Sequence, residues 1–140
     1  MASTADLAGQ ALTEAVSRLS GSPRQGQTTM VERVAATIED GGHLLVQAGT
    51  GTGKSLGYLL PAMVHAVQGG ERTLVSTATL ALQRQVMTKD APLAADAVEA
   101  VTGTRPSVAL LKGWRNYVCR HRLAGGYPPE DEDALFGPAH

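Results

Sequence analysis

Apolar residues recur at helical spacing in two stretches near the N-terminus. Over residues 3–19 the apolar positions fall on one helical face, and Ser3 or Thr4 stands before the first of them as an N-cap. A second stretch with the same spacing covers residues 27–39, and Gly41 follows it with a further glycine. The pattern therefore predicts two amphipathic helices before the middle of the chain.

The helical spacing returns further along the chain. Residues 56–67 carry an apolar stripe that is interrupted by Pro61, whose ring is expected to kink the helix, and a Gly-Gly pair closes the stripe. Thr79 is a suitable N-cap for the next helix. Pro92 suits the first turn of the helix that follows it. The later part of the chain is thus expected to contain three more helices.

Three short apolar runs have the composition of strands that are covered on both faces. They lie at residues 43–47, 73–77 and 107–111, and each is bounded by glycine, proline or a polar turn. Strands that alternate with helices are typical of right-handed βαβ units. We therefore expect an α/β fold with a parallel sheet and flanking helices.

Composition limits the classes of protein that the chain can belong to. Its 140 residues with a net charge of −1 fit one domain and give no global attraction to nucleic acid or membrane. No apolar run is long enough to span a membrane, and the N-terminus lacks the basic start and apolar centre of a signal peptide. The single cysteine, Cys119, excludes an internal disulfide framework and favours a reducing, cytoplasmic location.

A glycine-rich stretch lies between the first apolar run and the helix expected over residues 56–67. Strand, glycine-rich loop and helix N-terminus together are the setting of a phosphate-binding loop. Glycines let backbone N–H groups converge on an anion, while Lys54 can reach the β- and γ-phosphates and the Ser55 hydroxyl suits Mg²⁺. We expect a nucleotide site, with a glycine-rich surface turn as the alternative. The stretch reads Ala48-Gly49-Thr50-Gly51-Thr52-Gly53-Lys54-Ser55, so an alanine replaces the usual first glycine.

The chain changes character after the third apolar run. Residues 112–122 contain four lysine or arginine residues and no carboxylate, together with Trp114 and Tyr117. Such a stretch could stack on bases and bind phosphates of single-stranded DNA, or it could simply flank another domain. The only Asp-Glu string, at residues 131–133, follows a Gly-Tyr-Pro-Pro segment rather than an apolar strand. It therefore does not match a Walker B element.

Four separated stretches resemble the start of an iron–sulfur helicase of the DinG type, a relative of the XPD helicases in superfamily 2. The resemblance covers most of the chain from Arg24 onward and departs from the family pattern at Trp114. It implies a partial RecA-like P-loop NTPase lobe that uses ATP and Mg²⁺. The stretches are Arg24-x-x-Gln27, the phosphate loop from Ala48 to Ser55, Ser76-Thr77-Ala78-Thr79-Leu80-Ala81-Leu82-Gln83, and Leu111-Lys112-Gly113-Trp114-Arg115-Asn116-Tyr117-Val118-Cys119.

The resemblance implies roles for residues outside the phosphate loop. Gln27 would read the adenine edge, because a side-chain amide can both donate and accept there. Arg24 would have a phosphate-binding or structural role, or none. A group of four residues in the third stretch would contact single-stranded DNA through its backbone, although capping by one of them and an exposed helix face explain the same residues equally well. The group is Thr77, Ala78, Thr79 and Gln83.

The same resemblance makes Cys119 the first of four thiolate ligands of a [4Fe–4S] cluster. Such a cluster needs four cysteines, and this chain has one. We therefore expect Cys119 to be a ligand position in longer relatives and a free thiol here.

The resemblance also divides the chain into three parts. Residues 1–22 form an N-terminal helix and linker, residues 23–113 a partial ATP-binding lobe, and residues 114–140 the start of an iron–sulfur insertion. Neither a Walker B carboxylate nor an arginine finger is present, so the chain is expected to be an N-terminal helicase fragment that does not unwind DNA alone. The alternatives are a small P-loop phosphotransferase and a non-catalytic nucleotide- or DNA-binding module. The oligomeric state is not predicted.

Overall fold

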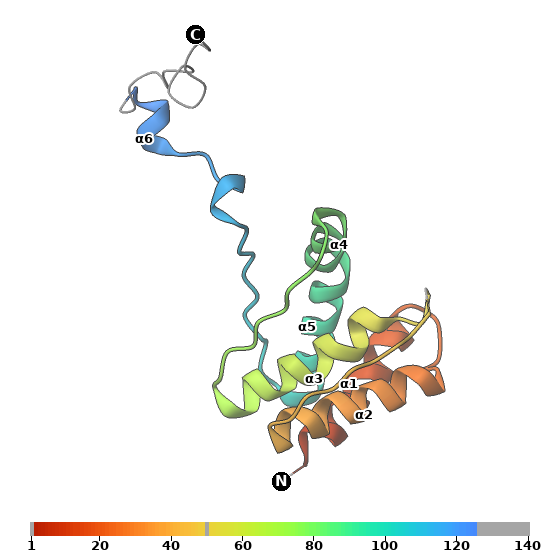
Figure 1. Cartoon of the computed structure of the whole chain (residues 1–140). Helices are drawn as coiled ribbons and strands as arrows, with labels where there is room; N and C mark the ends of the chain where they lie inside the picture. The colour runs from red at the N-terminus through yellow and green to blue at the C-terminus, as the bar shows by residue number, and fades with distance from the viewer. Residues whose placement is uncertain (1, 50, 126–140) are drawn as a thin grey trace. The chain divides into compact units, whose positions relative to one another are not determined.

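The structure, a computed structural model, describes residues 2–49 and 51–125 and divides into two compact units, Met1–Val108 and Ala109–His140. The first unit holds the long helices and the second holds two short ones (Figure 1). No helix in the described residues is long and apolar enough to cross a membrane. The first unit contains α1 (Thr4–Arg18), α2 (Gln25–Asp40), α3 (Lys54–Gly69), α4 (Leu80–Gln85), the π-helical turn η1 (Val86–Asp90) and α5 (Ala91–Thr102). The second contains the 3₁₀ turn η2 (Trp114–Asn116) and α6 (Arg120–Leu123).

The first predicted helix is confirmed as α1, and its start is fixed by a capping box. The Asp6 N–H donates to Ser3 Oγ at 3.1 Å, and the Ser3 N–H donates to Asp6 Oδ2 at 3.2 Å. Two N–H groups that the first turn of a helix leaves without partners are thereby satisfied. The Asp6 carboxylate also lies at the positive end of the helix dipole.

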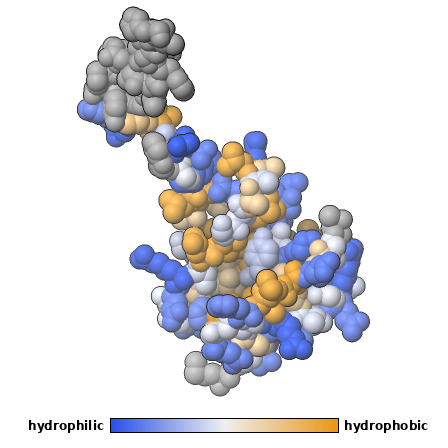
Figure 2. Space-filling model, viewed as in Figure 1, coloured by the Kyte–Doolittle hydropathy of each residue, from blue (hydrophilic) through white to orange (hydrophobic). Residues whose placement is uncertain are grey.

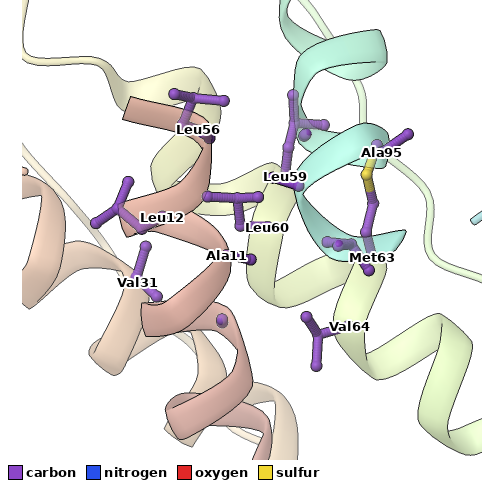
Figure 3. Close-up of a cluster of buried hydrophobic side chains, with 14 of the residues drawn as sticks. Ala11, Leu12, Val31, Leu56, Leu59, Leu60, Met63, Val64 and Ala95 are labelled. Carbon is purple, nitrogen blue, oxygen red and sulfur yellow. The ribbon is translucent and has the colours of Figure 1, made fainter. Parts of the chain in front are cut away.

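Helix α3 lies at the centre of the first unit and contacts α1, α2 and α5. Its residues Leu60 and Val64 are fully buried beside Leu12 of α1 and Val31 of α2, as the labelled side chains show (Figure 3). Complete burial of one such side chain stabilises a fold by about 1.5–3 kcal/mol. The helix continues through Pro61, which is itself buried. The core of the first unit is therefore built around the helix that follows the glycine-rich loop.

A glycine allows α2 and α3 to approach each other closely. A Cβ atom added to Gly57 of α3 would lie 2.7 Å from Met30 Sδ and 3.0 Å from Met30 Cγ, both on α2. Any larger residue at this position would push the Met30 side chain or the whole helix away. The contact holds α2 against α3 within one turn of the start of α3.

Hydrogen bonds tie the start of α1 to the ends of α2 and α3. The Thr4 N–H donates to Glu39 Oε1 at 3.1 Å, and Thr4 Oγ1 donates to Gln68 Oε1 at 3.2 Å. Gln68 Nε2 in turn donates to the Ala2 carbonyl at 3.4 Å. The N-terminal helix thus holds the far ends of the two helices that lead away from the glycine-rich loop.

Charged residues join α5 to its neighbours at the surface. Arg105 contacts Glu99 at 2.6 Å and Asp96 at 2.7 Å, and Asp96 also lies 3.8 Å from Arg18 of α1. The hydrogen bonds that Arg105 donates to Glu99 and Asp96 raise the pKa of Arg105 above its ordinary value. Because these groups are exposed, salt screens their attraction and the network makes a minor contribution to stability.

The two predicted helices after Thr79 are confirmed, but they form one continuous helical run from α4 through η1 to α5. Thr79 is the N-cap, and its Oγ1 accepts a hydrogen bond from the Leu82 N–H at 3.2 Å. In η1 the Ala91 N–H donates to the Val86 carbonyl, five residues earlier. Pro92 comes next and has no N–H to donate. The wider π turn therefore lies directly before Pro92, where the regular series of α-helical hydrogen bonds would lack a donor.

The predicted strands at residues 43–47, 73–77 and 107–111 are absent from the structure. The described residues contain helices, turns and irregular connections and no strand, so the predicted parallel sheet is not confirmed. Leu45 and Leu74 are 99% and 87% exposed, although burial on both faces was expected. Figure 2 shows hydrophobic residues (orange) among hydrophilic ones on the face seen there. A strand exists only where a second segment pairs with its backbone, and apolar composition cannot supply that partner.

Candidate nucleotide-binding site

The glycine-rich loop leads directly into α3, as predicted. Gly51 and Gly53 have φ angles of +78° and +74°, in the left-handed region where a Cβ atom is unfavourable. Gly53 is the N-cap of α3, so the loop turns into the helix at a residue that only glycine suits. Thr50, which was predicted to belong to the loop, lies outside the described residues.

Lys54 is folded back onto the loop. Its Nζ donates to the Ala48 carbonyl at 3.0 Å and to the Gly49 carbonyl at 2.6 Å. Thr52 Oγ1 donates to the same Gly49 carbonyl at 2.9 Å. The ammonium group therefore lies within the loop at the start of α3, where backbone N–H groups and a positive dipole end favour an anion.

Ser55 is the second residue of α3 and is half-buried. In the first turn of this helix the Gly57 N–H donates to the Gly53 carbonyl at 3.3 Å, which closes the turn. The N–H groups of Lys54, Ser55 and Leu56 precede that bond and have no carbonyl within the helix to bind. The loop and this turn thus combine donors, a cation and a hydroxyl group in one short segment.

Arg24 and Gln27 lie beside the loop, although they are distant from it in the sequence. Arg24 Nη1 donates to the Gly51 carbonyl at 2.9 Å. Gln27 Oε1 accepts from the Arg24 backbone N–H at 3.1 Å, and a Cβ at Gly53 would collide with Gln27 Nε2. The start of α2 and the glycine-rich loop are therefore in direct contact, which brings all the predicted nucleotide-binding residues of the described chain together.

The residues predicted to contact DNA lie immediately before α4 and in its first turn. Thr77 and Gln83 are half-buried, whereas Ala78 and Thr79 are exposed. Thr79 Oγ1 accepts a hydrogen bond from the Leu82 N–H, so the capping role of Thr79 is confirmed. In the part of the chain that the structure describes, no hydrogen bond or ion pair joins residues 77–79 to the phosphate loop. Contact with DNA stays a prediction.

Cys119 is exposed and immediately precedes α6 in the second unit. Upstream of it, the Lys112 N–H donates to the Tyr117 hydroxyl at 2.8 Å and the Asn116 N–H donates to the Gly113 carbonyl at 2.8 Å. Across residues 2–49 and 51–125, no group of three or more His, Cys, Asp or Glu side chains is placed to hold a metal ion. The acidic string at residues 131–133 lies outside the described residues.

Two features of the site could not be identified from the sequence alone. The contact between Gly57 and Met30 sets how closely α2 approaches the loop, although a glycine four residues before a proline gives no hint of its partner. The bond from Arg24 to the Gly51 carbonyl is the other. The sequence motifs include Arg24 and Gly51, but they do not indicate that the Arg24 side chain reaches the Gly51 carbonyl.

Comparison with known proteins gives matches over the part of the chain that contains these residues. The DEAD/DEAH box helicase family matches residues 24–117. The chain is 47% identical over 119 residues to "ATP-dependent helicase DinG" of Mycobacterium tuberculosis (strain ATCC 25618 / H37Rv), which covers 85% of this chain and 18% of that protein. It is 42% identical over 112 residues to "ATP-dependent DNA helicase YoaA" of Escherichia coli (strain K12), covering 76% of this chain and 16% of the relative.

A third relative, "ATP-dependent DNA helicase DinG" of Photobacterium profundum, is 39% identical over 106 residues, covering 72% of this chain and 15% of that protein. The chain therefore spans less than a fifth of the length of these curated relatives. No solved structure matches the chain. Because the family match covers most of the chain and includes the phosphate loop with Arg24 and Gln27, the chain belongs to the DEAD/DEAH box helicase family.

Proposed function

We propose that the first unit binds ATP with Mg²⁺ and forms part of the ATP-binding lobe of a DinG-type DNA helicase. The observation that carries the proposal is the geometry at the start of α3. Two glycines with positive φ lead into the helix, and the ammonium group of Lys54 lies within the loop that they form. A Cβ at Gly53 would collide with Gln27, so the close approach depends on the absence of a side chain there.

The residues present fit a nucleoside triphosphate with its metal ion. Lys54 would exchange its two carbonyl partners for the β- and γ-phosphates, and the Ser55 hydroxyl would be a ligand of Mg²⁺. The N–H groups of the first turn of α3 would donate to phosphate oxygens. Bound Mg²⁺ supplies charge neutralisation of the phosphates. In this proposal Ala48, Gly49, Thr50, Gly51, Thr52 and Gly53 form the remainder of the loop.

Gln27 is proposed to select adenine. Its Oε1 accepts a hydrogen bond from the Arg24 N–H, and its Nε2 lies against Gly53. The amide therefore lies beside the phosphate loop at the start of α2. There it could pair with the adenine edge, which offers both a donor and an acceptor.

We further propose that DNA binds through the segment before and within the start of α4. Thr77, Ala78, Thr79 and Gln83 are the residues concerned, and single-stranded DNA is the expected form. The names of the relatives support this proposal because two of those described are DNA helicases. The helicase family gives no comparable support to a phosphotransferase.

The chain's own residues do not fit a [4Fe–4S] cluster. A cluster of this kind requires four cysteine thiolates, and Cys119 is the single cysteine of the chain. Cys119 is therefore proposed only as a position that corresponds to a ligand in longer relatives, and no step of the proposed function involves it.

Calorimetric titration of the chain with Mg²⁺·ATP tests the nucleotide proposal. Lys54→Ala should abolish measurable binding, because the loop loses the cation that the phosphates require. Lys89→Ala is the matched control, because Lys89 is an exposed lysine in η1. This variant should bind Mg²⁺·ATP as tightly as the wild type does. Equal affinity of the Lys54→Ala variant and the wild type would overturn the proposal.

A further inference from the structure

We infer that Arg24 is a positioning residue that holds the phosphate loop in its anion-binding conformation before a nucleotide arrives. Arg24 would act on the Gly51 carbonyl and not on the phosphates themselves. The inference rests on the proposed nucleotide site, and it assigns to Arg24 a role that is distinct from that of Lys54.

The first step concerns the peptide group between Gly51 and Thr52. Its carbonyl accepts a hydrogen bond of 2.9 Å from Arg24 Nη1. This peptide is trans, so its N–H points to the side opposite its carbonyl. The bond from Arg24 therefore turns the Thr52 N–H away from α2. Among residues 2–49 and 51–125 this N–H has no hydrogen-bond acceptor, which leaves it able to donate to an anion.

The second step concerns the anchoring of Arg24 itself. Its backbone N–H donates to Gln27 Oε1, and its carbonyl accepts from the N–H groups of Gln27 at 2.9 Å and Thr28 at 3.1 Å. The residue is therefore fixed at the N-cap of α2. Within the described residues its guanidinium has no carboxylate partner and donates to the Gly51 carbonyl of the loop. A rigid, planar donor on a fixed backbone is suited to holding one carbonyl.

The third step compares Arg24 with the other side chains that hold the loop. Lys54 binds the carbonyls of Ala48 and Gly49, but it must leave them if it is to reach the phosphates. Thr52 binds the Gly49 carbonyl from within the loop. Among the side-chain donors to the loop in the described residues, Arg24 comes from another element, and its bond can persist while Lys54 moves. It can therefore preserve the loop geometry through nucleotide binding.

Nuclear magnetic resonance and calorimetry on the full chain test the inference with three variants. Arg24→Met keeps the length of the side chain and removes its donors, whereas Arg24→Lys keeps the charge and one donor group. Arg33→Met is the matched control, because Arg33 is an exposed arginine further along α2. The readouts are the Gly51 carbonyl ¹³C shift and the Thr52 ¹⁵N relaxation without nucleotide, and the affinities for Mg²⁺·ATP and Mg²⁺·tripolyphosphate.

For Arg24→Met we expect a changed Gly51 carbonyl shift and a more mobile Thr52 amide in the nucleotide-free chain. Both affinities should fall by the same factor, about tenfold for one hydrogen bond to a charged group. Arg24→Lys should recover part of both effects, and Arg33→Met should show neither. The same factor is expected for both ligands because Arg24 acts on the loop that binds the phosphates, and tripolyphosphate has these phosphates but no base.

Lost affinity with unchanged Gly51 and Thr52 signals would overturn the inference and make Arg24 a direct phosphate ligand. Unchanged affinity in Arg24→Met would overturn it as well. If the wild type bound neither ATP nor tripolyphosphate, the proposed function would fail. A change in the Gly51 and Thr52 signals would still support the action of Arg24 on the loop.

Discussion

The side-chain amide of Gln27 contacts two neighbours, the Arg24 backbone through its oxygen and Gly53 through its nitrogen. Gln27→Ala should therefore weaken binding of Mg²⁺·ATP more than that of Mg²⁺·GTP, because guanine presents a different pattern of donors and acceptors. Competition binding with both nucleotides measures the ratio.

Gln25→Ala provides the control for this experiment, since Gln25 is the exposed first residue of α2. It should leave the ratio of ATP to GTP affinity unchanged. An equal loss for both nucleotides in Gln27→Ala would remove the adenine-selecting role and leave Gln27 as a support of the loop.

Gly57 is the residue at which the spacing of α2 and α3 is most sensitive. Gly57→Ala would bring a Cβ atom to 2.7 Å from Met30 Sδ, so we expect destabilisation of about 1–3 kcal/mol from overpacking. Urea unfolding monitored by circular dichroism gives the value. Gly9→Ala is the control, because nothing lies within 4 Å of a Cβ at Gly9 and the helix gains propensity. If Gly57→Ala is as stable as Gly9→Ala, the close contact is not required.

At the scale of elements, α1 acts as a support for α2 and α3, the two helices beside the glycine-rich loop, although it lies outside the part of the chain that the helicase family matches. Leu12 of α1 is fully buried against α2 and α3. Leu12→Ala should cost about 2–5 kcal/mol of unfolding free energy, which thermal or urea unfolding can measure. Leu19→Ala should cost little because Leu19 is exposed. Similar losses for both variants would show that α1 does not pack as described.

The helices could be predicted from the sequence because the information that forms them is local. Ser3 with Asp6 and Thr79 with the following turn are short-range signals, and both caps are present. The strands could not be predicted reliably in the same way. Apolar runs such as residues 43–47 indicate burial, but pairing depends on a second segment that is distant in the sequence. The structure supplies no such partner among its described residues.

The same distinction applies to the candidate site. Lys54 and Ser55 could be placed from the sequence because the loop and the first turn of α3 are contiguous. Arg24 could be marked as a candidate, but its choice between a phosphate and the Gly51 carbonyl depends on how α2 packs against α3. That packing rests on Gly57 and Met30, whose contact no local pattern contains.

At the scale of the whole molecule, the 140-residue chain is expected to bind nucleotide without turning it over in response to DNA. Hydrolysis needs a carboxylate that holds Mg²⁺ and positions water, together with a cation that stabilises the transition state. Among the described residues no hydrogen bond or ion pair joins a carboxylate to the loop, and the arginine that reaches the loop, Arg24, binds the Gly51 carbonyl. Phosphate release from Mg²⁺·ATP with and without single-stranded DNA is the measurement, with Lys54→Ala as the control. DNA-stimulated release above that control would contradict the expectation.

The π turn between α4 and α5 makes this helical run unusually tolerant of a lost residue. Val86–Asp90 contains one residue more than an α-helical turn would need, because its closing bond spans five residues instead of four. Deletion of the exposed Thr88 can convert the turn to regular α-helix, so that Val86 and Val98 still face the core. Deletion of the exposed Ala36 in α2 would rotate all later residues of that helix by about 100°. In thermal unfolding, the variant that lacks Thr88 should therefore melt cooperatively near the wild-type temperature, whereas the variant that lacks Ala36 should not.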